Sequence, residues 1–252
     1  MPGDVTNTAA HSIVAVDPKW KGLYRIGGIS MITAGPVFII LAAFAIALAP
    51  SLASTDAALK NLASQATLLQ GDIGFAILSD LLVIPAALAL YFALKGLNKN
   101  AMTVAAGLLG LFVILDLGLS VPNFLQLTTI SQNYLAVTSD AQRSTYVASM
   151  NNLFSLLSLV SPICAFMVPS IGSLIASLVM HRGIFTRHVA YVGVFASAAG
   201  ILVGLSILLP PLANLDLIYL PLFGIWFMLV GFRLYGLGKE LPSIDKQSDL
   251  KT

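Results

Sequence analysis

The chain has 252 residues, of which 58% are hydrophobic and 10% are charged, and its formal net charge is +2. Soluble domains contain about 45–50% apolar and about 25% charged residues, so this composition excludes water as the main solvent of the protein. A net charge this small gives no indication of nucleic-acid binding. The composition predicts an integral membrane protein in contact with the lipid bilayer.

Six apolar runs are long enough to cross a bilayer, whose hydrocarbon core of about 30 Å needs about 20 helical residues. In chain order these runs are 26–49, 72–94, 101–121, 153–180, 189–209 and 217–235. The fourth run contains Pro162 and Pro169, and we expect its helix to be kinked there. The predicted fold is all-α, a polytopic bundle of six transmembrane helices.

Polar segments flank this bundle. We divide the chain into a polar N-terminal tail (1–25), a six-span membrane domain (26–238) and a polar C-terminal tail (239–252). The first tail has no apolar stretch followed by a small-residue cleavage site, as a removable signal peptide would have. We therefore expect the first span to direct insertion itself.

The basic residues predict the orientation. Eleven of the 13 Lys and Arg residues lie in the tails and in the connections on the same side, and the exceptions are Lys60 and Arg143. Short loops rich in Lys and Arg stay in the cytoplasm, so both termini are predicted to be cytoplasmic, in a cell (plasma) membrane. The outer side carries six acids instead: Asp56, Asp72, Asp80, Asp116, Asp140 and Asp216.

Two outer connections are long enough to form structure. Leucines and alanines fall on one face of residues 55–70, so this segment is predicted to lie as an amphipathic helix at the interface or to extend the second span. Residues 122–152 are rich in uncharged polar groups and are expected to pack over the outer ends of the spans. Within them, Ser139 and Gln142 have the spacing of a capping box that begins a helix.

Two acids lie well inside predicted spans. Counted from the outer boundaries, Asp80 is about 12 Å deep and Asp116 about 7 Å, so they can share one layer. A buried charge in a span is costly, and each acid should therefore face the bundle and hold a partner or a proton. Two such acids in contact would share a proton that a cation could displace.

A candidate site for a ligand, proton or cation follows from this pair. Ser120 and Asn123 extend a polar stripe outward from Asp116, and Asp72 adds charge at the outer edge together with Asp216. The candidate residues are Asp80, Asp116, Ser120, Asn123 and Asp72. The structural alternative is that Asp80 and Asp116 each form one interhelical hydrogen bond.

Other chemistry finds little support in the sequence. The three histidines, His11, His181 and His188, are all predicted on the cytoplasmic side, away from the acids, and there is no HExxH, P-loop or GxGxxG pattern. We therefore expect no metal site, no catalytic residues and no cofactor, haem included. Cys164 is the one cysteine and is expected to be a small buried side chain.

Small residues in the spans favour close helix packing. Gly200 and Gly204 form a GxxxG pattern in the fifth span. We interpret it first as packing within the chain, and the alternative is a homo-oligomer contact or a membrane-protein partner.

The chain resembles a prokaryotic family of multi-pass membrane proteins that is classed only as a domain of unknown function. The similar residues include Tyr24–Gly28, Asp80–Pro85, Ala89–Lys95, Asp116 with Leu117, His181–Arg187 and Arg233–Tyr235. The resemblance extends from Tyr24 to Gly238. It implies a compact membrane domain in a prokaryotic cell and supplies no catalytic or binding residues.

Three functions of different classes fit the sequence. The first is binding or transport of a small cationic or lipophilic ligand through an outward-facing site with paired acids. The second is an accessory or assembly subunit of a larger membrane complex, without catalytic activity. The third, which has the least support, is a membrane-embedded enzyme that modifies lipids through carboxylates alone.

Overall fold

The six predicted spans all form helices. The computed structural model describes residues 17–48 and 54–240, and every regular element within these ranges is helical. Six helical stretches are long and apolar enough to cross a membrane, so the all-α fold with six spans is confirmed. The elements are η1 (Pro18–Trp20), α1 (Lys21–Ala47), α2 (Thr55–Ser64), α3 (Ala66–Leu94), α4 (Lys99–Leu115), η2 (Asp116–Ser120), α5 (Val121–Ala136), α6 (Asp140–Ser161), η3 (Pro162–Met167), α7 (Val168–Met180), α8 (Arg187–Gly204), η4 (Leu205–Ile207), η5 (Pro210–Leu215) and α9 (Asp216–Glu240).

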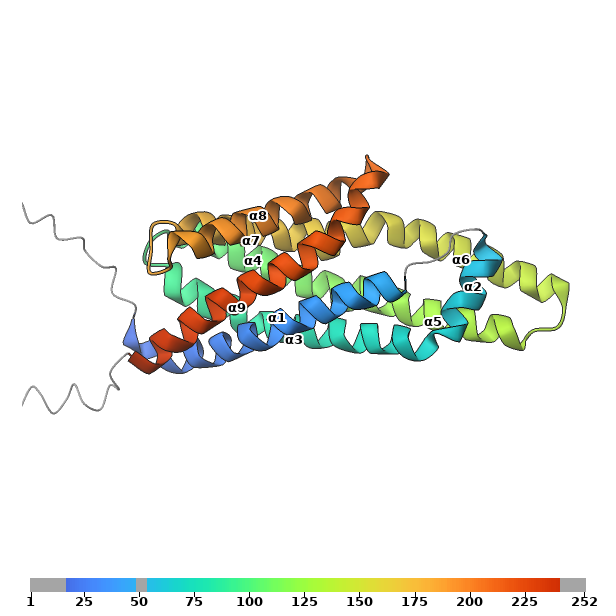
Figure 1. The fold of residues 1–252 in the computed structure, drawn as a ribbon, viewed down its shortest axis with the longest axis horizontal. Helices are drawn as coiled ribbons and strands as arrows, with labels where there is room; N and C mark the ends of the chain where they lie inside the picture. The colour runs from blue at the N-terminus through green and yellow to red at the C-terminus, as the bar shows by residue number, and fades with distance from the viewer. Residues whose placement is uncertain (1–16, 49–53, 241–252) are drawn as a thin grey trace, which may run out of the picture.

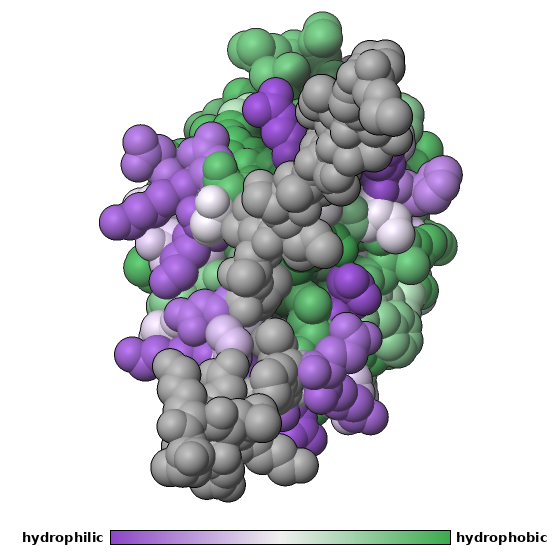
Figure 2. All heavy atoms as spheres, turned by 90° about the vertical axis from the view of Figure 1, so that its left-hand side faces the viewer, coloured by the Kyte–Doolittle hydropathy of each residue, from purple (hydrophilic) through white to green (hydrophobic). Residues whose placement is uncertain are grey.

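The helices form an elongated bundle (Figure 1). Helix α1 packs between α9 and α3, α4 packs against α7, and α8 lies against α7 and α9. The start of α1 and the end of α9 meet at one end, where Gly238 contacts Arg25. All described Lys and Arg residues except Lys60 and Arg143 lie in the helix ends and turns at this end, which we call the basic end. Figure 2 looks onto it and shows the hydrophilic side chains gathered there.

The sides of the bundle are apolar. Ile114 is 70% exposed, Phe195 67% and Phe232 60%, and each belongs to a different span. Large apolar side chains exposed in such number are unfavourable in water and fit contact with lipid tails. Inside the bundle, the largest fully buried side chain is Trp226 of α9.

The third and fourth spans are longer than predicted. Helices α4 to α5 form one stretch of 38 residues (Lys99–Ala136), and α6 to α7 form one of 41 residues (Asp140–Met180). At 1.5 Å per residue these stretches measure about 57 and about 62 Å, roughly twice the hydrocarbon core of a bilayer. Residues 122–152, which were expected to pack over the outer ends of the spans, mostly continue the third and fourth helices outward.

π-helical turns explain how the chain continues through its prolines. The third span was expected to end before Pro122, yet the π-helical segment η2 precedes this proline and the amide of Val121 bonds to the carbonyl of Asp116, five residues back. A π turn is wider than an α turn, so the proline ring and its missing N–H are accommodated. Segment η3 is also π-helical and lies between Pro162 and Pro169, where a kink was predicted.

Helix α2 crosses this outer extension. It begins at Ser54, whose Oγ accepts a hydrogen bond from the amide of Ala57 (3.2 Å). Its apolar face, including the fully buried Leu59, packs in a second hydrophobic cluster with α5 and α6. Residues 55–70 thus combine the two predicted arrangements. Their first part forms the separate amphipathic helix α2, and their last part extends the second span, because α3 begins six residues before Asp72. Helix α6 does begin after Ser139, but without the side-chain bond of a capping box.

Gly200 and Gly204 are used within the chain. A Cβ at Gly200 would meet Ser170 and Tyr219, and a Cβ at Gly204 would lie 2.9 Å from Met167 Cε. Both glycines are buried by helices of the same chain, so a homo-oligomer contact through them is not supported. Their role is the close packing of α8 against η3, α7 and α9.

The orientation of the bundle remains a prediction, and two arginines test it. On a Cys164→Ala background, Arg143→Cys at the far end is expected to react with a membrane-impermeant maleimide in intact cells, because short basic loops are retained inside. Arg182→Cys at the basic end should react only after the cells are permeabilised. The reverse labelling pattern would show that the basic end faces outward.

Candidate functional site

The predicted acids belong to different helices. Asp80 lies in α3, five residues before Pro85, and Asp116 is the first residue of η2. Asp80 is fully buried and Asp116 is 8% exposed, so both face the interior as expected. At 1.5 Å per residue, Asp80 is about 21 Å and Asp116 about 26 Å from the basic end of its own helix. The two carboxyl groups therefore lie at a similar depth.

The two π-helical segments meet at this level. Segment η2 contacts η3, and both contribute residues to one cavity. Asp116 and Ser120 come from η2, and Ala165 and Phe166 come from η3. Pro169 has no N–H, so a carbonyl near Ala165 loses its helical donor. Such π segments occur frequently at functional sites, because they change the direction of a few side chains within a long helix.

The cavity has a volume of about 360 Å³. Its walls are mainly apolar and include Phe38 of α1, Phe112 of α4 and Phe124 of α5. Four acids also line it, and its described lining contains no Lys, Arg or His. These acids are Asp72, Asp80, Asp116 and Asp216. The site thus combines a hydrophobic surface with carboxyl groups that no basic side chain of the lining balances.

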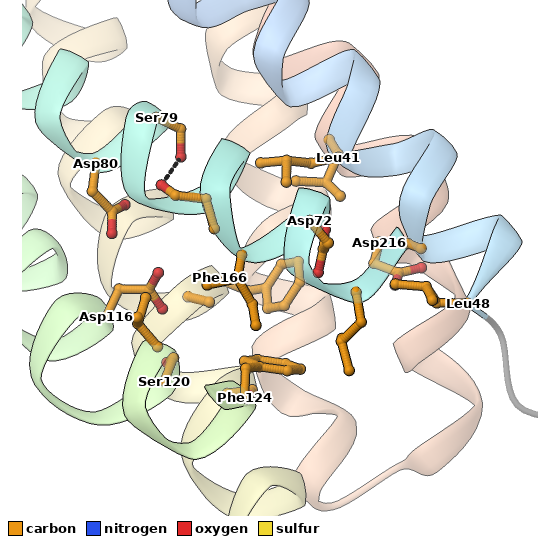
Figure 3. Close-up of a pocket in the computed structure, with 18 of the residues that line it drawn as sticks. Leu41, Leu48, Asp72, Ser79, Asp80, Asp116, Ser120, Phe124, Phe166 and Asp216 are labelled. Atoms are coloured by element: carbon orange, nitrogen blue, oxygen red, sulfur yellow. Dashed lines mark hydrogen bonds between the residues drawn. The ribbon is translucent and has the colours of Figure 1, made fainter. Parts of the chain in front are cut away.

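Asp80 and Asp116 point toward each other across the cavity (Figure 3). Their side chains are close enough to interact, and Asp116 also interacts electrostatically with Asp72. Asp72 and Asp216 lie farther along the pocket, near Leu48 (Figure 3). The four carboxyl groups form a path from the buried pair to the outer part of the bundle. In the described part of the chain, no three His, Cys, Asp or Glu side chains are grouped so as to hold a metal ion.

No hydrogen bond of good geometry to Asp80 occurs in the described structure, although its carboxyl group lies close enough to that of Asp116 to interact. Both of its carboxyl oxygens are buried and unpaired, and the nearby Oγ atoms of Ser120 and Ser161 are unpaired too. Ser79, by contrast, donates to the carbonyl of Ala76 (2.8 Å) and is satisfied within its own helix. A buried polar group without a partner costs about 1–3 kcal/mol, so these unpaired atoms mark a place where a ligand, proton or water would be stabilised.

Most of the predicted site residues come together. Asp80, Asp116, Ser120 and Asp72 all line the cavity. Asn123 is not among the residues that line it, and its Nδ2 donates to the carbonyl of Leu119 one turn earlier (2.7 Å). The π turn rotates the helix between Asp116 and the following residues, so the stripe expected from α-helical spacing does not continue to Asn123.

The aromatic wall was not predicted. Phe124, Phe154 and Phe166 come from three different elements, and phenylalanines are common throughout the apolar spans. No sequence signal separates these three from the phenylalanines that face lipid or fill the core. The role of Asp216 at the outer edge could be predicted, because it directly precedes an apolar span.

The chain matches no protein-family model, no curated protein and no solved structure. The resemblance noted above therefore stays a prediction, and the function has to be argued from the cavity itself.

Proposed function

We propose that this protein binds a small organic cation with an apolar body in the cavity between α3, η2 and η3. The observation that carries the proposal is the set of four acids in an otherwise apolar cavity, one of them fully buried and unpaired. A carboxylate in an apolar site is stabilised by a cation, and the hydrophobic wall supplies affinity for the rest of the ligand. Cavities that hold small ligands measure about 300–1,000 Å³, a range that includes this one.

The phenylalanines that line the cavity also favour a cationic ligand. The faces of aromatic rings attract cations, and Phe112, Phe124 and Phe166 line the cavity together with the acids. Quaternary ammonium ions are suited to such a site, because they carry a charge on a largely apolar surface. An anion of the same size would be repelled by the carboxylates. Cation binding is also the first step that a transporter would need, so the proposal fits both binding and transport.

Benzyltrimethylammonium is a suitable probe. We expect calorimetry on the protein in nanodiscs to detect its binding, and the double variant Asp80→Asn, Asp116→Asn to weaken binding by about 10- to 100-fold, as loss of a charged hydrogen-bonding or ionic partner does. Asp140→Asn, an exposed acid outside the cavity, is the matched control and should bind normally. Benzenesulfonate should not bind to any of these proteins.

The proposal fails if the double variant binds benzyltrimethylammonium as tightly as the natural chain. It fails equally if neither this probe nor a primary amine of the same size binds to the natural chain. In that case the accessory-subunit alternative becomes the better explanation of a stable bundle without a ligand.

A further inference from the structure

Helices α1 and α9 cross where both have glycines. Gly28 and Gly35 of α1 face Gly231 and Gly224 of α9, and a Cβ at Gly35 would lie 2.7 Å from the carbonyl oxygen of Gly224. The helices therefore touch backbone to backbone over these two turns. Phe38 follows the crossing and packs edge-on against the ring of Phe223.

Beyond this crossing both helices contribute to the lining of the cavity. Leu41, Ala45 and Leu48 contribute from α1, and Leu220 and Asp216 contribute from α9. All five side chains are partly exposed, whereas Asp80 at the other end of the cavity is fully buried. The lining of the cavity is therefore closed around Asp80 and partly exposed where α1 and α9 contribute, and we call these five residues of the outer halves of α1 and α9 the mouth. Figure 3 shows Leu48 and Asp216 together at the end away from Asp80.

The outer halves of α1 and α9 also carry exposed apolar side chains. Ile46 on α1 is 62% exposed and Ile218 on α9 is 58% exposed. Leu41 and Leu48 lie about 30 and about 40 Å along α1 from Lys21, which corresponds to the border between lipid tails and headgroups on the far side of a bilayer. Side chains of this kind at this depth are suited to lipid rather than to water.

We propose that the cavity is entered sideways from the bilayer, through the mouth between α1 and α9, by a single-chain cationic amphiphile. Its charged head lies between Asp80 and Asp116, and its apolar chain runs past Leu41 and Leu48 toward the lipid. Asp216 and Asp72 carry the head along the route from the interface to the buried pair. This inference rests on the proposed function, because it names the substrate class and the entry path of the same site.

Spin labels test the position of the mouth without any ligand. On a Cys164→Ala background, a nitroxide attached at Ala45→Cys is expected to collide with oxygen more than with a water-soluble nickel chelate in liposomes. Ala43→Cys, exposed on the same helix and outside the cavity, is the lipid reference, and Arg143→Cys on the outer extension is the water reference. A label at Ala45→Cys as accessible to the nickel chelate as the one at Arg143→Cys would overturn sideways entry.

Alkyltrimethylammonium ions test the ligand class. With the charged head bound at the acids, each added methylene should raise affinity about fourfold relative to the same ion in lipid-free buffer, and the rise should continue after the cavity is full, because the chain extends through the mouth. Decyltrimethylammonium should also immobilise the spin label at Ala45→Cys but not the one at Ala43→Cys. An affinity that stops rising at a short chain would overturn an amphiphile with its tail in the mouth.

A plug at the mouth completes the test. Ala45→Trp should slow association of decyltrimethylammonium at least tenfold, and Ala43→Trp should not change it. If benzyltrimethylammonium binding still depends on Asp80 and Asp116 while Ala45→Trp has no effect on association, the entry path is wrong and the proposed function stands. If no cation binds at all, both are wrong.

Discussion

The variant Asp80→Leu is expected to be more stable than the natural protein by about 1–3 kcal/mol and to bind organic cations about 10-fold more weakly. Asp80 is fully buried and both its carboxyl oxygens lack a partner, so the natural chain bears the cost of a buried polar group that leucine does not have. The cavity beside it gives a larger side chain room. Stability lost at a position that binds a ligand is common, because selection acts on function. Thermal unfolding in detergent measures the difference.

Ser173→Leu provides the contrast. Ser173 is as buried as Asp80, but its Oγ donates to the carbonyl of Pro169 (2.7 Å) and it does not line the cavity. Forcing leucine into this packed position should lower stability by about 1–3 kcal/mol. A loss of stability in Asp80→Leu as well would support the structural alternative, in which the carboxyl forms a stabilising interhelical bond.

The second large effect is expected at the crossing of α1 and α9. Gly231→Ala should lower the free energy of unfolding by about 1–3 kcal/mol, because a Cβ there would lie 2.8 Å from both the carbonyl oxygen of Gly28 and the amide of Ile32. These are backbone atoms, which cannot move aside without separating the two helices. Unfolding by heat or by denaturing detergent would measure this loss.

Gly110→Ala is the matched control on α4. Nothing lies within 4 Å of a Cβ at Gly110, and alanine is a better helix residue than glycine by about 0.5–1 kcal/mol. The same substitution should therefore stabilise at one position and destabilise at the other. Equal effects at both would mean that helix propensity, and not close packing of α1 on α9, decides the outcome.

The sequence was most informative where one property acts along a whole segment. A run of about 20 apolar residues has to cross the membrane as a helix, because its backbone groups find no other partners in lipid. All six spans could be predicted in this way, and so could the similar levels of Asp80 and Asp116 along their helices. The expectation that a proline ends a helix was wrong at the outer boundary of the third span. Pro122 follows a π turn there, and the sequence contains no signal that predicts this turn.

The pairing of the acids needed the tertiary structure. A sequence gives the position of Asp80 along its helix, but the rotation of α3 about its axis is set by contacts with α1, α4 and α5. Asn123 was mispredicted for a similar reason. The π turn before it changes the rotation of the helix, so Asn123 does not line the cavity. The place where α1 and α9 cross is another example, because it is fixed by glycines nearly 200 residues apart in sequence.

The sequence alone therefore determined the solvent, the number of spans and the similar level of the two acids along their helices, because hydrophobicity and helix rise act residue by residue. Only the tertiary structure decided that four of the acids line one mainly apolar cavity, to which the outer halves of α1 and α9 both contribute. Helix rotation, helix crossing and the π turns are collective results of packing, and no single segment specifies them.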